Sequence, residues 1–285
     1  MGLEPDRGTD NGPREPTPLE SDTLGGALKL EGTPVLNPVR KIYRAAKAVT
    51  LFLLASVELI LTRPRTRAER AAWLSRFCSR VLRGMDITFD VAGDIPLSGA
   101  VVSNHLTYLD ILLHSAIRPC VFVSKMELRK TPLLGWMSMM SGTVYVARGA
   151  GGSAAKAAEG MAKGFRDGLP VVFFPEGTTG VGDVPAMSFR SGLIAQTIEA
   201  AEPMRAAFIS YRLSKEDIAA GKTLRKDVHW GPETLWAHLW GFVGLHDLHA
   251  TIRFANQPIQ FTEAAVSDRK VAAEEARAAV VALSV

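Results

Sequence analysis

Between residues 86 and 211 the sequence alternates short apolar runs with longer amphipathic stretches. The short runs have the length and β-branched content of buried strands, and the longer stretches have the spacing of helices. The expected strands are residues 86–91, 100–103, 120–124, 142–147, 170–174 and 205–211, with a late strand within 251–261. The expected helices are residues 108–117, 132–140, 153–167 and 191–201. This alternation predicts an α/β fold: a mixed, largely parallel sheet covered by helices.

Shifts in composition divide the rest of the chain. Residues 1–35 are rich in Pro, Gly and acidic residues and have no apolar periodicity, so we expect a disordered tail. Residues 36–70 are expected to form a membrane-associating helical segment, 71–262 the α/β domain, and 263–285 a C-terminal helix. A second helix is expected at residues 68–84, before the first strand.

The segment from 36 to 70 contains an apolar stretch of about 14 residues with basic residues on both sides. As a helix this stretch would be roughly 21 Å long, shorter than the roughly 30 Å hydrocarbon core of a bilayer. Arg44, Lys47 and Glu58 fall on one side of a helical wheel, which gives the helix a polar side. The pattern favours an amphipathic helix that lies in or re-enters a membrane surface with anionic lipids. A core helix packed on the domain is the alternative.

Bulk composition narrows the possible partners. The formal net charge of +4 is too small to indicate nucleic-acid binding, but it suits an anionic lipid surface if the charges cluster. The two cysteines, Cys78 and Cys120, lie in apolar segments and fit buried thiols. The first residues carry no secretory signal, so the expected location is the cytoplasmic face of a membrane.

A histidine and an aspartate follow the expected strand at residues 100–103. His105 and Asp110 are five residues apart at the start of the next expected helix. In such a turn the carboxylate can bind one imidazole nitrogen and leave the other as a proton acceptor. The two residues would form the base and the orienting partner of a catalytic triad. The sequence shows no protein nucleophile nearby, so a substrate hydroxyl could be the nucleophile. The spacing alone equally fits a helix cap and a structural hydrogen bond.

Two further expected strands end in charged residues. Arg148 follows residues 142–147, and Glu176 follows residues 170–174. Ligands of open α/β sheets bind outside the carboxyl ends of the strands, so parallel neighbouring strands would bring these residues to the crevice of His105. Arginine can bind a phosphate with two parallel hydrogen bonds, and glycines at 177 and 180 let backbone N–H groups approach an anion.

These segments resemble the motif blocks of the glycerolipid acyltransferases, the family that includes bacterial 1-acyl-glycerol-3-phosphate acyltransferases. Residues 104–110 (NHLTYLD) are similar to the NHxxxxD block, and residues 142–148 (GTVYVAR) to the block that runs from glycine to arginine. Residues 174–178 (FPEGT) are similar to the FPEGT block, and residues 189–192 (FRSG) to an F-K-x-G segment. Order and spacing agree, and the resemblance covers roughly residues 75 to 260.

The resemblance implies a role for each matching residue. His105 would deprotonate the acceptor hydroxyl and Asp110 would orient His105. Arg148 would hold the acceptor phosphate, while Glu176, Gly177 and Thr178 would bind the acceptor and shape its pocket. It also implies an acyl thioester donor on coenzyme A or acyl carrier protein, a lysophospholipid acceptor, and no metal or redox cofactor.

Two positions depart from the family pattern. The FPEGT block is often followed by arginine, but Thr179 stands here, which removes one possible phosphate contact. The fourth block usually has two prolines, and residues 202–207 keep only Pro203. The acceptor therefore stays open between 1-acyl-glycerol-3-phosphate, which would give phosphatidic acid, and lyso-ornithine lipid or another lysolipid.

Other interpretations remain for the whole chain and for its aromatic residues. A non-enzymatic peripheral lipid-binding protein would use only the basic helix, and a hydrolase or thioesterase would use His105 to activate water. Trp236, Trp240 and Phe242 fit a packed core, with a membrane interface possible for some of them.

Overall fold

The computed structural model describes residues 36–126, 129, 134–140, 142–146, 153–231 and 233–285. The expected disordered tail, residues 1–35, lies outside the described residues. Within them, seven strands form one sheet in the order β1-β7-β6-β2-β5-β3-β4. All neighbouring strands are parallel except the β6–β7 pair, which is antiparallel. The expectation of a mixed, largely parallel sheet covered by helices is therefore confirmed.

Strand positions agree with the expected ones to within a few residues. The strands are β1 Ile87–Ala92, β2 Ala100–Ser103, β3 Val121–Lys125, β4 Val144–Val146, β5 Val171–Phe173, β6 Met204–Arg212 and β7 Leu248–Phe254. The late strand begins earlier than expected, at Leu248, and ends at Phe254.

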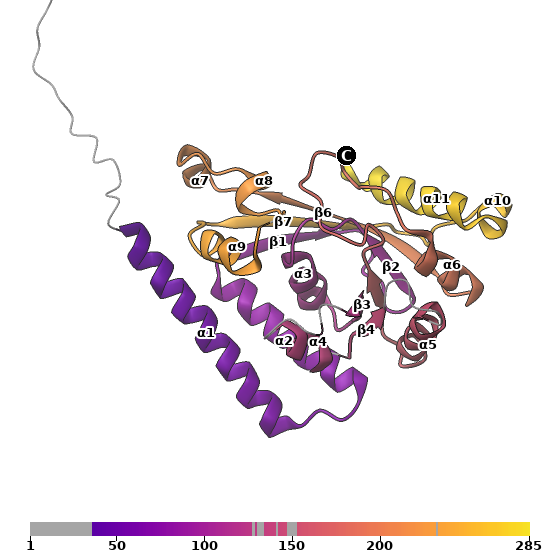
Figure 1. Cartoon of the computed structure of the whole chain (residues 1–285), viewed down its shortest axis with the longest axis horizontal. Helices are drawn as coiled ribbons and strands as arrows, with labels where there is room; N and C mark the ends of the chain where they lie inside the picture. Colours follow the sequence, from indigo (N-terminus) through magenta and orange to yellow (C-terminus); the bar gives the residue numbers. More distant parts are fainter. Residues whose placement is uncertain (1–35, 127–128, 130–133, 141, 147–152, 232) are drawn as a thin grey trace, which may run out of the picture.

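Helices cover both faces of the sheet (Figure 1). They are α1 Leu36–Thr62, α2 Arg67–Gly84, α3 Leu109–Ile117, α4 Leu134–Met140, α5 Ser153–Arg166, α6 Ser191–Glu199, α7 Lys215–Ala219, α8 Leu224–Asp227, α9 Leu235–Phe242, α10 Glu263–Ser267 and α11 Arg269–Val281. One core cluster joins the sheet to α1, α2, α3 and α9, and contains Trp73, Leu109 and Phe242. The other joins it to α5, α6 and α11, and contains Met161, Ile194 and Val280. The two cysteines are buried thiols, as expected.

The C-terminal region differs from the single expected helix. Helix α10 ends at Ser267 and α11 begins at Arg269 because Asp268 has an extended backbone and caps α11. Its side chain accepts a hydrogen bond from the Lys270 N–H at 2.7 Å. An N-cap of this kind satisfies a free donor of the first helical turn and begins a new helix.

Helix α1 is longer than the apolar stretch that it contains. It runs for 27 residues, about 40 Å at 1.5 Å per residue. Its part from Pro38 to Thr62 is long and apolar enough to cross a membrane, by length and composition. The apolar stretch expected from the sequence lies within this helix and includes Glu58, whose carboxylate pairs with Arg76 and Arg80 of α2. Helix α1 is thus a candidate membrane-contacting segment.

Candidate active site

His105 and Asp110 form a hydrogen-bonded pair at the carboxyl end of β2. His105 Nδ1 lies 2.8 Å from Asp110 Oδ2. Because an ionised carboxylate only accepts hydrogen bonds, Nδ1 carries the proton and Nε2 is left as the acceptor. The His105 side chain is 16% exposed whereas Asp110 is fully buried. A substrate can therefore reach the base but not its partner.

The buried Asp110 carboxylate is fully engaged by its surroundings. Its Oδ2 also accepts hydrogen bonds from the N–H groups of Leu106 at 2.6 Å and Thr107 at 3.0 Å. Its Oδ1 accepts one from the Tyr211 hydroxyl at 2.6 Å. Burial and the neighbouring Asp110 charge raise the pKa of Tyr211 well above its usual value, so the phenol remains a donor. Four donors compensate a charge that would otherwise be costly to bury.

Two neighbours fix the position of the His105 loop. The Phe174 ring stacks on the imidazole with a centroid distance of 4.1 Å and an interplanar angle of 14°. Asn104 bridges β2 to β6, donating to the Ile209 carbonyl at 2.9 Å and accepting from the Ile209 N–H at 2.8 Å. The imidazole is thus held in both plane and position before a substrate arrives.

Glu176 lies next to this pair because β2 and β5 are parallel neighbours. Its Oε1 accepts a hydrogen bond from the His105 N–H at 3.3 Å, and the residue is 6% exposed. Burial raises the pKa of Glu176 to about 7, against the lowering effect of hydrogen bonds from the His105 and Met187 N–H groups. The expectation that two strand ends bring these residues together is confirmed for His105 and Glu176.

The glycines after Glu176 act through backbone conformation. Gly177 has φ +69°, and a Cβ there would lie 2.7 Å from Arg190 Nε. Its N–H donates to the Phe174 carbonyl at 3.1 Å, and the Gly180 N–H donates to the His105 carbonyl at 2.7 Å. Both donors that were expected to approach an anion are therefore used inside the protein, where they fold the loop against His105. Thr178 lies exposed on this turn.

Basic groups near the crevice come from two places. Arg148 lies outside the described residues, but its strand β4 runs parallel to β3, and β3 parallel to β5. Its strand therefore ends at the same edge of the sheet as β2 and β5. Arg190 is exposed, and its guanidinium lies against Gly177. Thr179, at the position where the family often has arginine, donates its hydroxyl to the Trp230 carbonyl at 2.6 Å.

Sequence reasoning missed two residues of this site. Tyr211 is 101 positions from the carboxylate that it binds, and its only signal was a polar residue at the end of an apolar strand. Phe174 was recognised as part of a motif block but was given no role. Its position directly after a buried strand, two residues before Glu176, is the signal that would have placed it beside His105.

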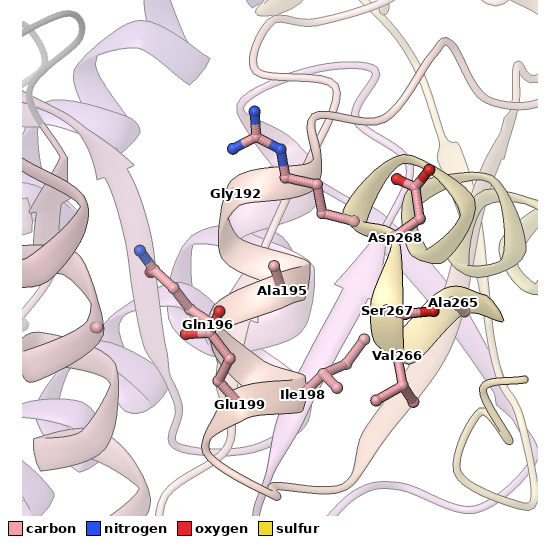
Figure 2. A pocket seen from close by; sticks show the side chains of 11 residues that line it. Gly192, Ala195, Gln196, Ile198, Glu199, Ala265, Val266, Ser267 and Asp268 are labelled. Atoms are coloured by element: carbon pink, nitrogen blue, oxygen red, sulfur yellow. The ribbon is translucent and has the colours of Figure 1, made fainter. Parts of the chain in front are cut away.

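A cavity of about 780 Å³ lies away from these residues, between α6, α10 and the start of α11 (Figure 2). Its lining includes Ala195, Glu199 and Ser267 and contains no histidine among the described residues. It offers no base of the kind that His105 provides, so the reaction centre is placed at the β2 and β5 ends.

The fold and this site define a class of protein. Residues 95–210, which contain β2 to most of β6 and the His105–Asp110 pair, match the family model described as Acyltransferase. This stretch of the chain is an acyltransferase-family domain, and the resemblance indicated by the motif blocks is confirmed.

Individual relatives of the chain are named as lipid acyltransferases. It is 34% identical to a lyso-ornithine lipid O-acyltransferase of Pseudomonas aeruginosa, over 49% of this chain and 52% of that protein. It is 31% identical to a 1-acyl-sn-glycerol-3-phosphate acyltransferase of Neisseria meningitidis, over 46% of this chain and 52% of that protein. The chain thus matches about half the length of these curated relatives.

A solved structure has the same fold. The crystal structure of the 1-acyl-sn-glycerophosphate (LPA) acyltransferase PlsC from Thermotoga maritima aligns with a TM-score of 0.56 at 20% identity. The alignment covers 86% of this chain and 97% of that one. At this identity the match establishes the fold alone.

Proposed function

We propose that the protein is a membrane-associated O-acyltransferase that moves a fatty acyl group from an acyl thioester to the hydroxyl of a lysophospholipid. The observation that carries the proposal is the His105–Asp110 pair, joined at 2.8 Å, with His105 part-exposed and no nucleophilic side chain of the protein bound to it among the described residues. A base with this geometry acts on a hydroxyl that the substrate brings.

The geometry supports a direct transfer. His105 Nε2 takes the proton of the acceptor hydroxyl as its oxygen attacks the thioester carbonyl. Asp110 stabilises the resulting imidazolium through Nδ1. The C–S bond then breaks, and the imidazolium returns the proton to the departing thiolate. The acyl thioester, on coenzyme A or acyl carrier protein, is a co-substrate, and the proposed reaction requires no metal or redox cofactor.

The first candidate acceptor is 1-acyl-glycerol-3-phosphate, which would give phosphatidic acid. Its phosphate requires a cation beside the crevice, and the exposed guanidinium of Arg190 against Gly177 can supply one. Arg148 is the second proposed phosphate contact. Glu176, Gly177 and Thr178 would shape the acceptor pocket between them.

Lyso-ornithine lipid is the second candidate acceptor. The observation that favours it is Thr179, whose hydroxyl is bound to the Trp230 carbonyl where the family often has a cation. A site with one cation fewer is better suited to a zwitterionic head group than to a phosphate monoester. The Pseudomonas aeruginosa relative is named for this acceptor.

The deciding experiment is acyl transfer by the purified protein over a panel of lysolipids with both donor types, read by mass spectrometry. Acylation of either acceptor that is lost in His105→Ala supports the proposal and selects the acceptor. Thiol release that does not depend on a lysolipid would indicate a hydrolase. Vesicle binding without thiol release from any donor would indicate a lipid-binding protein.

We propose further that the enzyme works at the cytoplasmic face of a membrane with anionic lipids. Binding at the bilayer would bring the enzyme within reach of an insoluble acceptor. The apolar helix α1 supports contact with a membrane.

A further inference from the structure

The outer face of α1 carries no charge along most of its length. Between Ile42 and Leu61 its exposed residues are all uncharged: Ile42, Tyr43, Ala46, Val49, Thr50, Leu53, Leu54, Val57, Ile60 and Leu61. Two charged residues of the same stretch, Arg44 and Glu58, face the protein instead. Arg44 is 3% exposed and donates to the carbonyls of Met85 and Leu245, and Glu58 pairs with α2. The polar side of the helix is therefore the packed side, and the apolar side faces outward.

Helix α1 is fastened to the domain along both of its halves. Arg44 holds the first half, while the Ala55 carbonyl accepts the Trp73 indole N–H at 3.1 Å in the second. Ala55 and Leu59 belong to the core. A helix that crossed a bilayer would have to release one of these sets of contacts. With both in place, α1 lies along the membrane surface with its outer face toward the acyl chains.

A second exposed apolar surface lies beside the first half of α1 (Figure 1). Trp236 and Trp240, one turn apart on α9, are 60% and 52% exposed, which corrects the expectation that they belong to the core. Phe242 is buried, as expected, because the opposite side of α9 packs inward with His238. The segment after α9 contacts α1 directly: Gly244 lies against Lys41, and the Leu245 carbonyl accepts from Arg44.

The inner side of α9 touches the segment that bears the catalytic pair. Tyr108, three residues after His105, places its hydroxyl 3.2 Å from His238 Nδ1. The Tyr108 ring also packs edge-on against Phe242 at 6.0 Å and Trp230 at 6.2 Å. A lipid contact made by the outer side of α9 would thus lie one helix away from the base.

We propose that Trp236 and Trp240 are a second membrane anchor that, together with the outer face of α1, docks the outer side of α9 onto the surface of an anionic bilayer. Tryptophan prefers the membrane–water interface, where its ring is apolar and its N–H meets polar groups. Helix α9 has no charged residue on any side. The basic residues just before the uncharged face, Arg40 and Lys41, suit anionic head groups.

The first test measures binding of the full chain to vesicles of phosphatidylcholine and phosphatidylglycerol by co-sedimentation. Trp236→Ser with Trp240→Ser is compared with Ile218→Ser with Val266→Ser, which removes side chains that are 59% and 63% exposed on α7 and α10. The tryptophan pair should weaken partitioning on the order of tenfold or more, since two large apolar rings lose their lipid contact. The control pair should bind like the wild type. Equal binding by both double variants, or an equal loss in both, would overturn the proposal.

The second test asks whether these indoles themselves enter lipid. Brominated lipids should quench the fluorescence of the wild type, and Trp236→Phe with Trp240→Phe should lose that quenching while binding is kept. Unchanged quenching in this variant would overturn the proposal. So would sedimentation equilibrium in which the serine variant only converts a dimer to a monomer, because a second copy would then be the occupant.

A third test measures acyl transfer. It rests on the proposed function, whereas the two binding tests do not. The serine variant should acylate a water-soluble short-chain lysolipid like the wild type and lose transfer to a vesicle-embedded one. Equal loss on both substrates would overturn the anchoring role. If the wild type transfers no acyl group at all, the proposed function fails, and vesicle binding and quenching still decide the anchor.

Discussion

At the scale of single residues, the candidate chemistry depends on one proton acceptor. In His105→Ala the acceptor hydroxyl loses its base, so kcat should fall about a hundredfold to ten-thousandfold. The fold should persist, because the imidazole is 16% exposed. Rates of thiol release and a thermal unfolding curve check both statements. Turnover like that of the wild type would remove His105 from the mechanism.

Tyr211 should act on the reaction only through Asp110. Tyr211→Phe leaves the buried Oδ1 of Asp110 without its 2.6 Å donor, so the free energy of unfolding should fall by roughly 1–3 kcal/mol. Because the carboxylate keeps its other three donors, kcat should fall less than in His105→Ala. Denaturant unfolding and initial rates measure the two effects. Tyr43→Phe, at a side chain that is 64% exposed, is the matched control and should leave stability unchanged.

The raised pKa of Glu176 predicts a pH dependence of stability. With the pKa near 7 in the folded protein and near the ordinary 4.5 when unfolded, the unfolded state releases this proton first as pH rises. The contribution of Glu176 to the free energy of unfolding is therefore fully present below about pH 4.5. It decreases by roughly 3 kcal/mol as the pH rises to about 7. Glu176→Gln should flatten the unfolding free energy across this window.

The control for Glu176 is Glu216→Gln, which changes an exposed carboxylate of α7. It should keep the wild-type slope of unfolding free energy against pH. The slope is the readout, because the amide also weakens the contact with the Met187 N–H and shifts stability at every pH. If Glu176→Gln keeps the wild-type slope of unfolding free energy against pH, the folded protein binds this proton at another residue.

At the scale of secondary-structure elements, the packing of α1 depends on one buried guanidinium. Arg44→Met would remove the side-chain donor of the Met85 carbonyl and leave the Leu245 carbonyl with the Arg40 guanidinium at 3.4 Å, which should cost roughly 2–4 kcal/mol of stability. The helix should then separate from the domain and become sensitive to limited proteolysis. Lys47→Met removes a charge from the same helix at a side chain with no hydrogen-bond partner among the described residues, and should leave the cleavage pattern unchanged. Equal protection of α1 in both variants would contradict this role.

The positions of strands and helices could be predicted from the sequence where a local pattern of apolar residues determines them. The β2 and β5 runs are buried on both sides and end in turn-forming residues, so hydropathy alone located them, and with them His105 and Glu176. Helix α9 lies within residues 212–250, where no regular pattern was recognised. It is short, and its start depends on the Thr234 hydroxyl accepting from the Ala237 N–H at 3.4 Å.

Which way an apolar face points could not be predicted from periodicity. The wheel of α1 places Arg44 and Glu58 on one side correctly, but the same pattern fits a polar side toward water and one toward the protein. The partners that decide it, Leu245 for Arg44 and Arg80 for Glu58, are 201 and 22 residues away. The exposed tryptophans of α9 were misjudged for the same reason, since an indole spacing of four residues fits either a core or a lipid surface.

At the scale of the whole molecule, apolar and basic groups should contribute separately to membrane binding. Exposed arginines at 63 and 65 stand at one end of the uncharged face of α1, and Arg40 and Lys41 stand at the other. Attraction between these surface charges and anionic lipids is screened by salt, because the Debye length falls from about 10 Å at 0.1 M to about 3 Å at 1 M. The apolar contact has no such dependence.

Raising the salt concentration from about 0.05 M to about 0.5 M should therefore weaken binding to phosphatidylglycerol-containing vesicles down to the level for pure phosphatidylcholine, and no further. Co-sedimentation at several salt concentrations measures this. Arg63→Gln with Arg65→Gln should flatten the salt dependence while keeping the residual binding, whereas Trp236→Ser with Trp240→Ser should lower the residual binding and keep the slope. A salt dependence that is the same for both lipid compositions would mean that the basic ends do not meet lipid head groups, and α1 would then be held by its apolar face alone.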